Sequence, residues 1–119
     1  MVHSFLDLKV WQKAQYLAEQ IYRITRTFPK DEVFGLTTQL RRSAVSVAAN
    51  IAESHGRYHY KDKLRSLYIS RAEICEIRSH LRIALSQNYI NKKDFKTIDD
   101  DYDGLTIGIN CFIKSSHKH

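Results

Sequence analysis

Apolar residues recur at intervals of three and four between short polar breaks, and this period constrains the fold more than any other feature. The sequence has one proline and four glycines. Turn-forming breaks at 28–35, 55–59 and 86–94 divide the chain into four segments. The period and the breaks together predict four helices, approximately over residues 6–27, 35–56, 60–87 and 93–115.

The first and last segments each carry one clear apolar stripe. The first comprises Trp11, Ala14, Ala18, Ile21, Thr25 and Phe28, and the last comprises Phe95, Ile98, Tyr102, Leu105, Ile109 and Phe112. Asp94 is the predicted N-cap of the last helix. Its β-branched residues would also suit a strand, but the sequence offers no partner strand. Short connections then predict one all-α domain over residues 1–119, an antiparallel up-down four-helix bundle.

The second segment, with the sequence QLRRSAVSVAANIAESHGR at 39–57, has an unusually wide apolar arc and a narrow polar stripe. Small residues fill much of the arc, so we expect this helix to pack against two other helices and against another subunit. Asn50, Glu53 and Arg57 lie along the stripe. Two interpretations are open: a solvated face, or a polar network buried between helices or subunits.

The third segment repeats this combination of apolar and charged residues. Arg71 and Arg78, seven residues apart, project between two apolar strips. A buried guanidinium requires a carboxylate partner, for which Glu53 is the preferred candidate. Alternatively, both arginines extend from the edge of the core into water. Cys75 and Cys111 lie within apolar patterns and are expected to be reduced and buried.

The charge balance favours an anionic partner. The chain has 19 Lys and Arg against 13 Asp and Glu, a net charge of +6. Acidic residues are concentrated in DDDYD at 99–103, whereas basic residues are spread along the chain. A basic surface attracts nucleic acid or acidic protein. Because the sequence shows neither a membrane span nor the layout of a signal peptide, we expect a cytoplasmic protein without a membrane partner.

The densest basic cluster is RYHYKDKLR at 57–65, where Arg57, Lys61, Lys63 and Arg65 surround two tyrosines. Basic residues supply sequence-independent affinity for phosphates, and tyrosines stack on unpaired bases. The cluster predicts binding of RNA or DNA without strong sequence specificity. The simpler alternative for the cluster is a solvent-exposed start of a helix. The alternative function is a scaffold that docks a polymerase or another protein.

The sequence contains little that indicates catalysis or metal binding. His55 and His59 have the i,i+4 spacing of a metal pair, but Gly56 falls between them and no third ligand is near. The sequence contains no phosphate-binding glycine loop, nucleophile elbow or Glu-x-x-His pair. We therefore expect a non-enzymatic protein with no cofactor and no metal.

The stretch 39–57 resembles the signature of the 23S rRNA intervening-sequence protein family, Q-x-R-R-A-x-x-S-I-x-x-N-I-A-E-G followed by G-R. FLDLKVWQKA near the start, SRAEICEIRSHLRIA in the third segment and the following NYI also match, so the resemblance spans nearly the whole chain. Ser54 replaces a usual glycine, and Ala72-Glu73 replaces a Gly-Ser pair. The matching positions are Gln39, Arg41, Arg42, Ser46, Asn50, Glu53, Arg57, Arg71 and Glu76.

This resemblance implies a four-helix bundle protomer, often assembled as a pentamer and encoded within insertions in bacterial ribosomal RNA genes, with no known enzymatic activity. The family is distantly similar to the accessory protein of diversity-generating retroelements, a basic pentamer that engages a reverse transcriptase and nucleic acid. Arg41 and Arg42 accordingly join the predicted nucleic-acid-binding residues. The expected structural network comprises Asn50, Glu53, Arg71, Glu76 and Arg78.

Overall fold

Four long helices make up most of the structure: α1 Lys9–Thr25, α2 Leu36–Gly56, α3 Tyr60–Ser86 and α4 Lys92–His117. Two short 3-10 helices, η1 Phe5–Asp7 and η2 Lys30–Glu32, precede α1 and α2. The computed structural model describes residues 4–117, so the ends of the predicted 1–119 range lie outside it.

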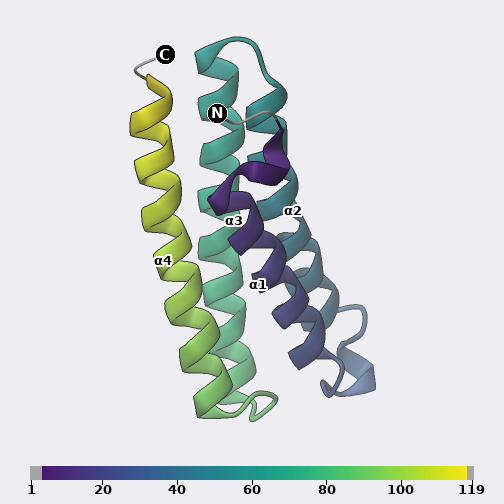
Figure 1. The fold of residues 1–119 in the computed structure, drawn as a ribbon. Helices are drawn as coiled ribbons and strands as arrows, with labels where there is room; N and C mark the ends of the chain where they lie inside the picture. Colours follow the sequence, from purple (N-terminus) through teal and green to yellow (C-terminus); the bar gives the residue numbers. More distant parts are fainter. Residues whose placement is uncertain (1–3, 118–119) are drawn as a thin grey trace.

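Consecutive helices run in opposite directions, as Figure 1 shows. Each helix packs against the next one along the chain, α4 closes onto α1, and α2 and α3 form the most extensive pair. This arrangement confirms the predicted all-α four-helix bundle. The start of α1, the α2–α3 turn and the end of α4 lie together at one end of the bundle (Figure 1).

Each helix contributes one apolar face to a common core. The fully buried large side chains come from all four helices and include Leu17, Ile21, Leu40, Ile51, Leu67, Ile74, Leu81, Ile98, Tyr102 and Ile109. In α1 the centre of the face is the Leu17–Ile21–Ile24 line, and Trp11 and Ala18 lie half-buried at its edges. Burial of such apolar faces is the main contribution to the free energy that holds amphipathic helices together.

Two helix starts differ from the sequence prediction. Residues 5–7 form a separate 3-10 turn, because the Ser4 hydroxyl accepts a hydrogen bond from the Leu6 N–H at 3.0 Å, and α1 begins only at Lys9. The predicted cap of α4 was wrong. The side chain of Asn91 accepts the Asp94 N–H at 2.7 Å, so Asn91 caps the helix and Asp94 lies in its first turn.

The α2–α3 interface is built from small residues. Ser43, Ser54, Ser66 and Ser70 are buried, and the Ser70 hydroxyl donates to the Val47 carbonyl at 2.9 Å. These contacts bring the two backbones close together. Ser43 therefore belongs to the core. By contrast, Val45 and Ala49, two apolar residues of the wide arc of α2, are exposed within the subunit.

Candidate nucleic-acid interface

Basic and aromatic side chains gather at the α2–α3 turn. Arg57 follows the last residue of α2, and Lys61 and Arg65 lie one turn apart on the first part of α3. All three are exposed, and neither Lys61 nor Arg65 has an ion-pair partner among the described residues. Tyr58 projects from the turn with 91% of its surface exposed. The turn and the start of α3 thus present three exposed cations and one uncovered ring.

Lys63 has a different position from the other three basic residues. Its ammonium donates to the carbonyls of Ser54 at 3.0 Å and His55 at 3.4 Å, in the last turn of α2. Helix C-termini leave carbonyls without intrahelical donors and favour a nearby cation. Lys63 is only partly exposed and ties the start of α3 to the end of α2.

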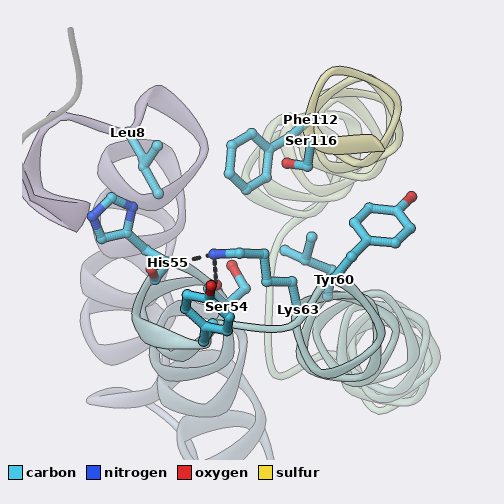
Figure 2. Close-up of a pocket in the computed structure, with 9 residues that line it drawn as sticks. Leu8, Ser54, His55, Tyr60, Lys63, Phe112 and Ser116 are labelled. Carbon is cyan, nitrogen blue, oxygen red and sulfur yellow. Dashed lines mark hydrogen bonds between the residues drawn. The ribbon is translucent and has the colours of Figure 1, made fainter. Parts of the chain in front are cut away.

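A cavity of about 270 Å³ lies beside this turn, where the ends of three helices meet. Figure 2 shows Lys63 reaching from α3 toward Ser54 and His55, with Phe112 and Ser116 of α4 facing it across the cavity. Leu8 closes the side next to α1, and the remaining wall consists of Tyr58, Tyr60 and Leu67. The cavity combines apolar surface, aromatic rings and one ammonium group.

A sequence profile of one family covers most of the chain. The profile described as "23S rRNA-intervening sequence protein" matches residues 6–110. The chain belongs to this family. The match includes the basic turn and all of α2 and α3, whereas Phe112 and Ser116 of the cavity lie beyond the matched range.

One solved structure shares the fold of this chain. It is a protein of unknown function from the S23 ribosomal protein family of Bacteroides thetaiotaomicron, 24% identical in sequence. It superposes with a TM-score of 0.80, over 88% of this chain and 95% of that one. No curated protein matches the sequence.

Arg41 and Arg42, which match the family signature, lie far from the basic turn. They precede Arg57 by about four helical turns, roughly 23 Å along the axis. The Arg41 Nε donates to Thr25 Oγ1 at 2.8 Å, and its guanidinium lies 4.8 Å from the centre of the Tyr22 ring. Arg42 bridges α2 to α3 through Glu76 at 2.7 Å and Glu73 at 3.4 Å. These two arginines connect helices and do not extend the basic turn.

The predicted pairing of Glu53 with Arg71 was wrong within the subunit. Glu53 is exposed and faces Arg57 at 3.8 Å, whereas the Arg71 Nη1 donates to Asn110 Oδ1 of α4 at 2.6 Å. The Arg71 guanidinium also lies over the Tyr68 ring. Asn50, half-buried, donates to the Ser46 carbonyl and hydroxyl of its own helix. The polar stripe of α2 therefore makes local contacts and does not bridge to α3.

Arg78 pairs with two carboxylates of α4, the buried Asp99 and the exposed Asp103, and neither was predicted from the sequence. Arg78 and Arg82 both donate to Asp99, with Nε–Oδ1 and Nη1–Oδ1 distances of 2.9 Å. Burial alone would raise the pKa of Asp99, but the hydrogen bonds from the two guanidinium groups lower it to about 2. Asp99 follows Ile98, which belongs to the buried stripe of α4. This position next to a core residue was the feature of the sequence that could have indicated a buried carboxylate.

Glu76 joins a second α2–α3 cluster. It accepts from Arg42 and lies 3.4 Å from the His80 Nε2. Burial acts to raise the pKa of Glu76, but its hydrogen bonds to His80 and Arg42 outweigh this and lower it. The cluster links the two most extensively packed helices through charged groups at their outer edge.

Three other expectations concern cysteines, metals and membranes. Cys75 and Cys111 are exposed, contrary to the prediction, because they lie on the outer faces of α3 and α4. Among the described residues, no three His, Cys, Asp or Glu side chains form a group that could hold a metal ion. In the same part of the chain, no helix combines the length and apolar character needed to span a bilayer.

Proposed function

We propose that this member of the 23S rRNA-intervening sequence protein family is a non-enzymatic, cytoplasmic homo-oligomer that binds RNA or DNA with little sequence preference. The α2–α3 turn is its binding surface. Arg57, Lys61 and Arg65 supply the phosphate contacts, and the neighbouring rings meet the bases. Lys63 serves the turn mainly by holding the two helix ends together.

The observation that carries this proposal is that three exposed cations and the exposed Tyr58 ring occur together within residues 57–65. A buried aromatic ring is explained by packing, but the Tyr58 ring is almost fully exposed, and its aromatic contact is with the adjacent His59, at 5.1 Å between ring centres. Cations contribute phosphate affinity that is insensitive to sequence, and exposed rings supply stacking. Repetition of the turn in an oligomer multiplies a weak contact.

A salt titration tests the proposal. Fluorescence anisotropy of labelled single-stranded and duplex oligonucleotides is measured for the wild type and for the double variant Lys61→Ala/Arg65→Ala. We expect weaker binding of every sequence and a shallower slope of log affinity against log salt. The slope should change by roughly 0.7–0.9 for each phosphate that the variant no longer neutralises.

The matched control is Lys92→Ala/Lys93→Ala, which removes the same charge from the exposed start of α4 at the opposite end of the bundle. This control should keep the wild-type slope. Equal weakening in both variants would assign the affinity to net charge alone. Absence of wild-type binding at low salt would overturn the proposal and leave the protein-docking scaffold as the working hypothesis.

A further inference from the structure

We propose that the cavity beside the α2–α3 turn holds one unpaired nucleobase of a bound strand. This inference rests on the proposed function and names the part of the nucleic acid that the site selects. It concerns the space enclosed by α2, α3 and α4, not the exposed cations alone.

The size and lining of the cavity fit a single planar ring system. Its volume of about 270 Å³ lies just below the roughly 300–1,000 Å³ range of small-ligand sites, so it suits a group as small as one nucleobase. Phe112, Tyr60, Tyr58 and His55 place four rings around the space. Aromatic walls favour a flat π-system over an aliphatic chain, because base–aromatic stacking adds to simple apolar burial.

The polar groups of the cavity match the edge of a base. Lys63 carries three N–H donors, of which two are directed at the Ser54 and His55 carbonyls, so one is available for a base oxygen or ring nitrogen. The Ser54 hydroxyl is buried and donates to the Ile51 carbonyl at 2.6 Å, so the Lys63 ammonium is the polar group that a base would meet. A single ammonium can donate to an oxygen or ring nitrogen of several bases, in agreement with weak sequence preference.

The position of the cavity explains how the rest of a strand would be held. Tyr58 lines the cavity and directly follows Arg57 in the chain, so a base in the cavity leaves its adjoining phosphate close to Arg57. A duplex cannot enter without losing a base pair, because its bases are stacked and their edges are paired. The site therefore favours single strands and loops.

The decisive comparison uses two single strands of equal length, one with bases and one abasic. Both carry the same phosphates, so they differ only in their bases, which the cavity and the exposed Tyr58 ring would contact. We expect the wild type to bind the base-bearing strand about tenfold more tightly than the abasic strand, and to bind a duplex about as weakly as the abasic strand. Equal affinity for the two single strands overturns the inference while leaving intact the proposed binding of phosphates at the α2–α3 turn. If neither strand binds at low salt, the proposed function itself fails.

A pair of variants places the effect in the cavity. Ser116→Trp fills it from the last turn of α4, whereas Ser115→Trp adds the same side chain at the exposed neighbouring position. The first should abolish the preference for the base-bearing strand, and the second should keep it. A preference that persists in a folded Ser116→Trp protein, verified by circular dichroism, would place base recognition elsewhere. If that variant does not fold, Phe112→Leu, which keeps an apolar side chain but removes a ring, should reduce the preference.

A third measurement distinguishes two possible ligands of the cavity, a base within a strand and the base of a free nucleotide. Adenosine 5′-monophosphate is titrated against the wild type while the aromatic NMR signals of Tyr60 and Phe112 are observed. Shifts in these signals that are absent in Ser116→Trp support a nucleobase in the cavity. Such shifts combined with equal affinity for base-bearing and abasic strands would assign the site to a free nucleotide and overturn its role in strand binding.

Discussion

Asp99 illustrates how one residue stabilises the contact between two helices. Its side chain is only 9% exposed, and two guanidinium groups of α3 meet it there. An ion pair of this kind is favourable only when the hydrogen bonds compensate for the loss of hydration. Four N–H groups donate to its two oxygens, so this condition is met at Asp99.

The lowered pKa of Asp99 predicts a loss of stability in acid. A carboxyl group whose pKa falls from 3.8 to about 2 on folding stabilises the folded state above pH 3.8. This contribution, about 2 kcal/mol, disappears as the pH falls from about 4 to about 2. Urea unfolding at a series of pH values should show it. In Asp99→Asn the acid-dependent loss over this interval should be smaller by the same amount.

The same substitution should destabilise the protein at neutral pH. Asp99→Asn leaves Arg82 without a carboxylate partner among the described residues and leaves Arg78 paired with Asp103 alone. Because both arginines reach solvent, we expect a cost of about 2 kcal/mol, below that of a fully buried pair. Asp100→Asn is the control, since Asp100 pairs with Lys96 on the surface and should cost less than about 0.5 kcal/mol. Equal costs in urea titrations of the two variants would contradict the structural role of Asp99.

At the scale of the element, the α2–α3 turn depends on Lys63. Lys63→Ala removes the donor to the last carbonyls of α2, so the free energy of unfolding should fall by about 1 kcal/mol. Lys61→Ala, two residues earlier and exposed, should change it by less than about 0.5 kcal/mol. Chemical denaturation of the two variants distinguishes the roles. If both were equally neutral, the Lys63 ammonium would not be a helix cap.

The start of α4 depends on Asn91 in a comparable way. Because the Asn91 side chain satisfies the Asp94 N–H, Asn91→Ala should lower stability by about 1 kcal/mol. Asp94→Ala should cost less, because its carboxylate acts through its position in the first turn, a 3.3 Å contact with Asn91 and a partly exposed ion pair with Arg23 at 3.6 Å. Thermal unfolding of both variants measures the difference, and the reverse order would restore Asp94 as the cap.

At the scale of the whole molecule, apolar side chains remain on the outside of the bundle. Exposed examples from three helices are Val45 at 48%, Ile69 at 43% and Ile107 at 60%. We expect a second copy of the chain to cover part of this surface, in a pentamer of 13.9 kDa subunits. Multi-angle light scattering at micromolar concentration should give that mass, and Ile69→Lys should lower it without loss of helical structure. A wild-type monomer would contradict the expectation.

The number and type of elements followed from the sequence, because helical period and turn-forming residues are local properties. The basic turn was also visible, since Arg57, Lys61 and Arg65 are close together along the chain. Local patterns failed at helix ends, where Ser4 and Asn91 form hydrogen bonds that spacing alone does not reveal. A cap depends on the geometry of one or two residues, which the period of a whole segment does not specify.

Tertiary structure decided which distant side chains meet. The pairing of Arg78 with Asp99, 21 residues away, and of Arg71 with Asn110 depends on the rotation and register of α3 against α4. The same register exposes Cys75 and Cys111, and the close approach of α2 and α3 buries Ser43. The cavity likewise exists only because residues from Leu8 to Ser116 converge at one end of the bundle. Periodicity defines the faces of each helix, but the packing of side chains between helices selects the register in which those faces meet.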